Sequence, residues 1–291
     1  MSYCYLSTSL CRNQSIEEAI IKCGDLSNKH VELSAPHPFQ TTNEISILFK
    51  KYKVIGYNFT LHNYFPPPQK SFVLNIASNQ KDTINECRNI VNSALTLSLA
   101  AESPLYGVHA GYLSKATAKK DGMFKFEGEH YSYSDALKRS AEFINSVVNS
   151  FIEQKKKFLV ENLFPSVARN SSLFCDLNQI NDLMSQVPKE VGLLLDLGHL
   201  NISSKIMNFD REKFLDNFLE KYGDRLHEVH ISENDGLKDE HRALEENSWQ
   251  YDAIKKIHEI KNSERVYCLE SRNAEKQQLV SNLDQINNII S

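Results

Sequence analysis

Eight short apolar segments, separated by longer amphipathic or polar stretches, follow one another along this chain. Such alternation is typical of repeated βα units around a parallel sheet. The 291-residue length lies within the roughly 200 to 400 residues of single α/β barrels. We therefore predict an α/β protein with one (β/α)₈ TIM barrel, in which residues 1–291 form a single domain.

Most of the segments expected as barrel strands end in a polar or ionisable residue. They are Tyr3–Ser7, His30–Ser34, Val54–Leu61, Leu105–His109, Lys157–Glu161, Val191–Leu197, Leu226–Ile231 and Val266–Glu270.

Helices are expected between these strands. Ser15 with Glu18 and Ser132 with Asp135 have capping-box spacing, which predicts helix starts near Ile16 and Tyr133. Apolar residues at helical spacing predict further helices. These cover Asp82–Ala101, Ala136–Phe151, Phe209–Tyr222, Asp252–Ile260 and Lys276–Ile290.

Composition limits the classes of partner. With 41% hydrophobic residues the chain can form a sizeable core, and its net charge of −4 gives no global attraction to nucleic acid or an anionic membrane. A local basic groove remains possible. The six cysteines lack a C-x-x-C pair, which favours free thiols, and the sequence shows neither a signal peptide nor a membrane-spanning run. We expect a soluble cytoplasmic protein.

Two irregular stretches, Asn63–Phe72 and Tyr112–Tyr131, follow strands that end at or beside a histidine. Loops after barrel strands line the face on which barrel enzymes build their active sites. Both are therefore expected beside the site. A basic run in the second stretch could contact a phosphate or could simply be solvated. It comprises Lys115, Lys119, Lys120 and Lys125.

Ionisable side chains collect at the predicted strand ends and just after them, from the third strand to the eighth. Barrel closure would bring these ends into one pocket. The candidate metal ligands are His62, His109, Glu161, Asp196, His199, His230, Asp239, His241 and Glu270.

A mixed set of imidazoles and carboxylates suits borderline divalent cations such as Zn²⁺ or Mn²⁺. Nine ligands exceed the needs of one ion, so we expect one to three ions per chain. The alternative is that these groups only hydrogen-bond one another. His199 could instead cap a helix or orient Asp196.

Seven short motifs occur in an order that resembles the xylose-isomerase-like barrel superfamily. Within it, the spacing is most similar to the endonuclease IV (apurinic/apyrimidinic endonuclease family 2) branch and to related sugar phosphate isomerases and epimerases. The motifs are LHNYF at 61–65, FVLNIAS at 72–78, VHAG at 108–111, VEN at 160–162, LLDLGH at 194–199, HISENDGLKDEH at 230–241 and LES at 269–271.

The resemblance implies two alternative sites. In the endonuclease branch, the nine matching positions hold three zinc ions, with Glu161 bridging two of them. In the isomerase and epimerase branches, one Mn²⁺-type ion is held by Glu161, Asp196, His230 and Glu270. There the two glutamates also shuttle a proton next to a carbonyl, which makes Glu161 and Glu270 the expected catalytic residues.

One stretch departs from both branches. A glycine-rich turn usually follows the D-x-H motif, but residues 242–250 read RALEENSWQ and contain no glycine and the bulky Trp249. We expect this loop to alter the approach to the substrate. Arg272, two residues after Glu270, is a candidate substrate-binding cation.

Our first hypothesis for function is a metal-dependent isomerase or epimerase acting on a sugar, a sugar phosphate or a related hydroxy-carbonyl compound. The alternative is an endonuclease IV-like multinuclear zinc phosphodiesterase that acts on damaged DNA. Net acidity and the lack of clustered arginine and aromatic residues in the predicted loops disfavour it. A third possibility is a non-catalytic, metal-stabilised binding protein.

Overall fold

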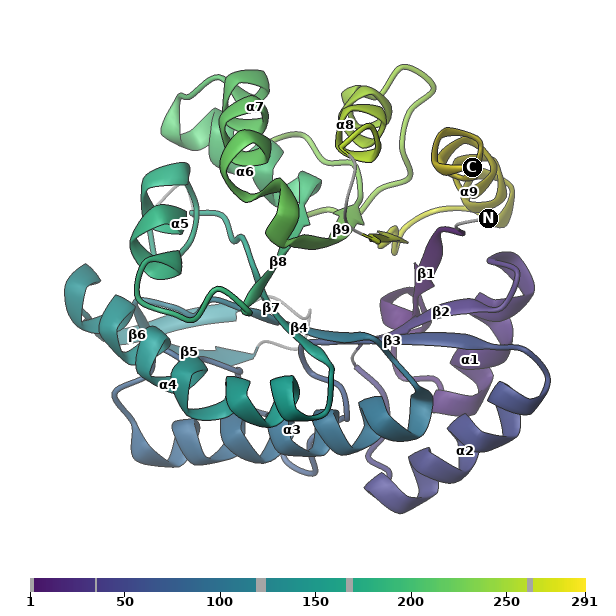
Figure 1. Ribbon diagram of the computed structural model, residues 1–291, viewed down its shortest axis with the longest axis horizontal. Coiled ribbons are helices and arrows are strands. Elements are labelled where there is room, and N and C mark those ends of the chain that lie inside the picture. Colours follow the sequence, from purple (N-terminus) through teal and green to yellow (C-terminus); the bar gives the residue numbers. More distant parts are fainter. Residues whose placement is uncertain (1–2, 35, 119–123, 166–169, 261–263) are drawn as a thin grey trace.

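Eight parallel strands close into a barrel in the computed structural model, which describes residues 3–34, 36–118, 124–165, 170–260 and 264–291. Around the barrel the strands follow the order β1-β10-β9-β8-β7-β4-β3-β2, and helices surround them (Figure 1). The predicted α/β TIM barrel is confirmed.

The barrel strands are short and mostly buried. They are β1 Tyr5–Ser7, β2 His30–Leu33, β3 Asn58–His62, β4 Leu105–His109, β7 Lys157–Glu161, β8 Gly192–Asp196, β9 Leu226–Ile231 and β10 Val266–Leu269.

The helices of the described residues pack mainly outside this barrel (Figure 1). They are α1 Ile16–Leu26, α2 Thr42–Val54, α3 Lys81–Ala101, α4 Tyr133–Glu153, α5 Leu177–Met184, α6 Leu197–Met207, α7 Arg211–Tyr222, α8 Trp249–His258 and α9 Lys276–Ile290. Two 3₁₀ turns, η1 Thr8–Cys11 and η2 Gly223–Arg225, complete the set.

Strand β8 shows why a barrel strand is a continuous apolar run in the sequence. All five of its residues, from Gly192 to Asp196, are buried because helices cover one side and the barrel interior the other. Gly192 allows close packing, since a Cβ there would press against the side chains of Leu159 and His227. Parallel pairing places Asp196 beside His230 of β9, so strand register itself brings two candidate ligands together.

The predicted strand Val54–Leu61 was wrong at its start. Val54 is the last residue of α2, and the strand runs from Asn58 to His62. The helix begins at a capping box between Thr41 and Glu44, a signal that the predicted strand boundary did not include. Gly56, with φ of +92°, lies in the turn between the two elements.

Both predicted helix starts are correct. Ser15 accepts the amide proton of Glu18 at 3.2 Å, and the Glu18 carboxylate accepts the Ser15 amide proton at 3.0 Å. Ser132 accepts the amide proton of Asp135, but the shorter Asp135 side chain does not complete a capping box.

We expect Ser15→Ala to lower the free energy of unfolding by about 1 kcal/mol, because the first turn of α1 loses its side-chain acceptor. Urea unfolding followed by circular dichroism measures this change. The same substitution at the exposed Ser150, inside α4, should leave stability nearly unchanged. Equal losses from the two variants would contradict the capping contribution.

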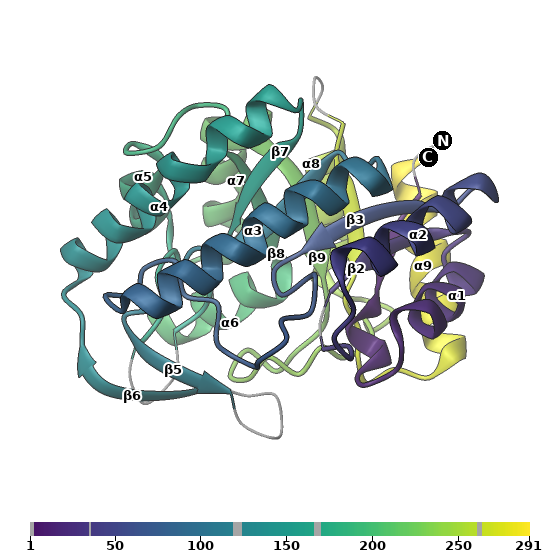
Figure 2. The same cartoon turned by 90° about the horizontal axis from the view of Figure 1, so that it is seen from below.

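The stretch Tyr112–Tyr131 is not an irregular loop, as predicted, but contains an antiparallel hairpin. Its strands are β5 Ser114–Ala118 and β6 Phe124–His130, and the hairpin projects from the barrel (Figure 2). Phe124 and Phe126 pack against Tyr112, which gives the hairpin an apolar anchor.

The basic run lies partly on this hairpin. Lys115 is exposed, and Lys125 pairs with Glu127 at 2.6 Å, as expected for a solvated strand. Lys119 and Lys120 lie outside the described residues. Among the helices that the structure describes, none has the length and apolar character needed to cross a membrane.

Candidate metal centre

The nine predicted ligand residues lie together at one end of the barrel. His62, His109, Glu161 and Asp196 are the last residues of β3, β4, β7 and β8. His230 is the penultimate residue of β9, and Glu270 directly follows β10. The carboxyl ends of parallel strands therefore place these side chains around one buried volume.

One part of the cluster is formed by two histidines and a shared carboxylate. His62 Nε2 lies 2.8 Å and His109 Nε2 3.2 Å from Glu161 Oε2. His62 and Glu161 are almost fully buried, and the ring of His109 is mostly covered. These atoms are close enough to bind one ion together.

The second part is centred on His230 Nδ1. This nitrogen lies 3.4 Å from Glu270 Oε2, and 4.0 Å from both Glu161 Oε1 and Asp196 Oδ2. Three carboxylates, at the ends of β7 and β8 and just after β10, thus surround one ring nitrogen. Within the described residues, His230 Nδ1, Glu161 Oε1 and Asp196 Oδ2 are buried and have no hydrogen-bond partner. Such atoms suit a cation that binds between them.

The third part is formed by His199, Asp239 and His241. His241 Nε2 lies 2.6 Å and His199 Nε2 3.8 Å from Asp239 Oδ2. His199 also connects this group to the other two, because its Nδ1 is 3.3 Å from Glu161 Oε1. All nine predicted residues therefore belong to one connected cluster.

Three histidines of the cluster share a pattern of hydrogen bonds. His199 Nδ1 contacts the Asn162 carbonyl at 2.8 Å, and His241 Nδ1 contacts the Glu270 carbonyl at 2.9 Å. The Nδ1 atom of His109 contacts the Tyr112 hydroxyl at 2.9 Å. In each ring the other nitrogen faces a carboxylate of the cluster. Metal-binding histidines have this arrangement, because a partner on one nitrogen orients the other toward the ion.

Charge is concentrated in the cluster. Burial alone would raise the pKa of Glu161, but His109 and His62 hold this pKa well below its usual range. Burial raises the pKa of Asp196 to about 6 against the opposing effect of His199, with a contribution from the negative charge of Glu161. The donor set of nitrogen and oxygen atoms fits a divalent cation, which would compensate these buried carboxylates.

Asp196 and His199 also have a local structural role. The Asp196 side chain caps the first turn of α6 by accepting the His199 amide proton at 2.7 Å. The helix cap is therefore the aspartate rather than the histidine. Because the two residues are three positions apart, about one helical turn, both side chains reach the cluster.

Arg272, the predicted substrate-binding residue, lies at the edge of the cluster. Its Nη2 donates to Glu270 Oε1 at 2.8 Å, and one quarter of its side chain is exposed. The ion pair fixes one Glu270 oxygen and leaves Oε2 directed at His230. Arg272 thus orients a cluster carboxylate while remaining accessible at the surface.

Residues 242–250 do not form one continuous loop, as the sequence suggested. Arg242 pairs with Glu233 in an antiparallel bridge, and Trp249 is the first residue of α8 rather than part of a loop. The guanidinium of Arg211 lies 3.7 Å from the centroid of the Trp249 ring. The bulky side chain is therefore held between helices by a cation–π contact.

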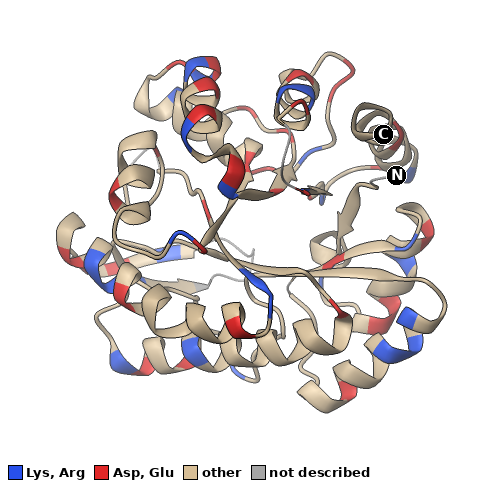
Figure 3. Cartoon of the chain, viewed as in Figure 1, with Lys and Arg blue, Asp and Glu red and all other residues tan. Residues whose placement is uncertain are grey.

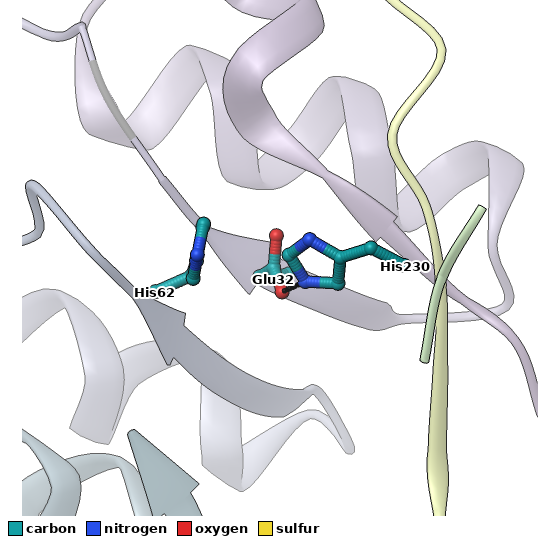
Figure 4. A group of neighbouring side chains, drawn as sticks. All are labelled: Glu32, His62 and His230. Atoms are coloured by element: carbon teal, nitrogen blue, oxygen red, sulfur yellow. Dashed lines mark hydrogen bonds and ion pairs between the residues drawn. The ribbon is translucent and has the colours of Figure 1, made fainter. Parts of the chain in front are cut away.

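Two buried carboxylates of the barrel interior were not predicted. Glu32 of β2 lies 2.8 Å from His230 Nε2, and Glu228 of β9 lies near Glu32. Figure 4 shows Glu32 between His62 and His230. Both glutamates interrupt apolar strands, which is a signal in the sequence. The prediction considered only the residues at strand ends and therefore did not include them.

The fold and this cluster define an α/β barrel with a buried site suited to divalent metal. A family model for the xylose isomerase-like TIM barrel matches residues 26–288, so the chain belongs to that family. The predicted resemblance is confirmed at this level.

Individual relatives are distant. An uncharacterized protein of Methanocaldococcus jannaschii, MJ1614, is 23% identical over 217 residues, which cover 75% of this chain and 74% of that protein. A D-tagatose 3-epimerase-like protein superposes with a TM-score of 0.75 at 18% identity, covering 99% of this chain and 98% of its own. The 3-keto-D-glucoside 4-epimerase of E. coli gives 0.73 at 15% identity, covering 99% and 100%.

Proposed function

We propose that this protein is a divalent-metal-dependent isomerase or epimerase that acts on a sugar, a sugar phosphate or a related hydroxy-carbonyl compound. The observation that carries the proposal is the arrangement around His230 Nδ1, where Glu161 and Glu270 approach from different strands together with Asp196. Two carboxylates beside one bound carbonyl compound could remove a proton from carbon and return it.

The cation would supply Lewis-acid polarisation of the substrate's carbonyl oxygen. Glu161 and Glu270 would each hold or move a proton at the neighbouring carbon. Arg272 would keep Glu270 in one orientation and contact the substrate from its exposed edge. Mn²⁺ and Zn²⁺ both accept this mixed donor set, so either is compatible with the site.

The comparisons support a carbohydrate as the substrate. Structures that superpose over nearly the whole chain include the 3-keto-D-glucoside 4-epimerase of E. coli and an L-ribulose 3-epimerase. In the view of Figure 3, Lys and Arg are distributed over several outer helices along with Asp and Glu. That distribution offers no support for a broad DNA-binding surface.

The decisive experiment is proton exchange. Protein loaded with Mn²⁺ or Zn²⁺ is incubated with a panel of keto-sugars in D₂O, and proton NMR detects deuterium at the carbon next to the carbonyl. We expect metal-dependent exchange with at least one sugar or sugar phosphate. Absence of exchange across the panel, together with metal-dependent cleavage of another bond, would contradict the proposal.

A zinc phosphodiesterase acting on abasic-site DNA is a second candidate, and one observation favours it. His62, His109, His199, Asp239 and His241 extend the cluster beyond the four residues that a single ion needs. Three ions would use all nine side chains. Metal counting by plasma emission and nicking of an abasic-site duplex separate the two candidates. Three zinc equivalents with nicking would replace the isomerase proposal.

A further inference from the structure

A second layer of carboxylates lies in the barrel interior, beneath the candidate metal centre. Glu32 and Glu228 are both completely buried. Glu228 lies close to the cluster. Both Glu228 Oε2 and His62 Cδ2 are near Gly107, because a Cβ added to that glycine would lie 3.5 Å from the first atom and 3.4 Å from the second. Buried carboxylates are costly unless they have a partner, so each needs a structural or functional reason.

Glu32 has a well-defined partner. Its Oε2 atom lies 2.8 Å from His230 Nε2, and both side chains are fully buried (Figure 4). An ionised carboxylate can accept hydrogen bonds but cannot donate them, so the proton of this bond belongs to His230 Nε2. The opposite nitrogen, Nδ1, then faces Asp196, Glu161 and Glu270.

We propose that Glu32 is a positioning residue, which fixes the orientation and tautomer of His230 so that Nδ1 binds the cation. The inference rests on the metal centre of the proposed function. It assigns Glu32 the same role for His230 that backbone carbonyls have for His199 and His241. His230 is the ring whose orienting partner is a charged side chain from a distant strand, 198 residues away in sequence.

An alternative is that Glu32 itself binds an ion with His62 and His230, because one ligand atom of each lies within 4.8 Å of the others. One contact opposes it, because His230 Nε2 is engaged by Glu32 at 2.8 Å. If His230 bound ions through both nitrogens, its ring would have to lose both protons, which is costly near so many carboxylates.

The test compares Glu32→Ala, Glu32→Gln and a matched control, Glu228→Gln, which changes a carboxylate of the same buried layer. Zn²⁺ affinity is measured by competition with a chromophoric chelator, after circular dichroism has established folding. We expect Glu32→Ala to weaken binding about 10- to 100-fold. Glu32→Gln keeps an acceptor for Nε2–H and should retain most of the affinity. Glu228→Gln should bind as the wild type does.

A second measurement reports the tautomer. In the Zn²⁺-loaded wild type, ¹⁵N–¹H spectra should show a slowly exchanging proton on His230 Nε2, and in Glu32→Gln this proton should exchange faster. This arm remains informative if Glu32→Ala does not fold. A wild-type His230 that carries its proton on Nδ1 would overturn the proposal.

The outcomes separate this inference from the proposed function. A wild type that binds no divalent cation overturns the metal centre itself. A wild type that binds tightly, with Glu32→Ala unchanged, overturns only the positioning role. If Glu32→Ala at saturating Zn²⁺ binds one metal equivalent fewer than the wild type, Glu32 is itself a ligand. If Glu228→Gln weakens Zn²⁺ binding as much as Glu32→Ala does, the loss reflects a general disturbance of the buried layer. Either result overturns the proposal.

Discussion

Glu161→Gln and Glu270→Gln should each lower kcat by at least about 10²-fold, to the limit of detection in most assays, while the barrel stays folded. Glutamine nearly preserves the shape of each side chain but cannot accept a proton from carbon. It also provides a weaker ligand, and Glu161 contacts His62, His109 and His199 through its two oxygens. The deuterium-exchange assay described above measures the loss.

The matched control is Glu153→Gln, the same change at an exposed position at the end of α4. It should leave exchange at the wild-type rate. Circular dichroism and thermal unfolding of all three variants show whether lost activity reflects lost structure. Near-native turnover by either Glu161→Gln or Glu270→Gln would refute the assignment of that glutamate as a catalytic residue.

The architecture was predictable because barrel strands produce a strong local pattern. Leu105–His109, Lys157–Glu161 and Leu226–Ile231 match the observed strands from end to end. The error at Val54 has a physical cause, since Val54 and Ile55 are apolar residues that lie exposed at the end of a helix. A β-branched pair beside a strand extends the apolar run without belonging to it.

The hairpin β5–β6 was missed for a different reason. Its residues alternate weakly, and the Lys and Glu side chains of β6 resemble a polar loop. The anchoring contacts of Phe124 and Phe126 with Tyr112 are tertiary, so the sequence pattern alone did not contain them.

The geometry of the candidate site was predictable where it depends on strand ends. Parallel pairing aligns His109 with Glu161 and Asp196 with His230, so barrel topology converts separated sequence positions into neighbours. Glu32 was not predicted, because its role depends on an inward direction in the middle of the barrel. That direction follows from register between β2 and its neighbours rather than from any motif.

Saturating Zn²⁺ should raise the midpoint of thermal unfolding by on the order of 10 °C relative to chelator-treated protein. A ligand at a thousand times its dissociation constant stabilises a fold by about 4 kcal/mol if it binds only the native state. A protein of this size converts that stabilisation into a shift of this order. The physical source is the buried negative charge of Glu161, Asp196 and Glu270, which a cation compensates. Differential scanning calorimetry measures the shift.

Asp196→Asn provides the control for this shift, because it removes a charged oxygen from the centre of the cluster while nearly preserving volume. Its Oδ2 atom has no hydrogen-bond partner among the described residues, so the metal-free protein should lose little stability at that atom. Zn²⁺ should therefore stabilise Asp196→Asn much less than the wild type. An equal shift in both proteins would mean that the stabilising ion binds elsewhere. No shift in the wild type would mean that the imidazoles compensate the charge of the buried carboxylates without a metal. Because Asp196 is one of three carboxylates within 4.0 Å of His230 Nδ1, we expect the Zn²⁺-induced rise in the unfolding midpoint to be clearly smaller in Asp196→Asn than in the wild type.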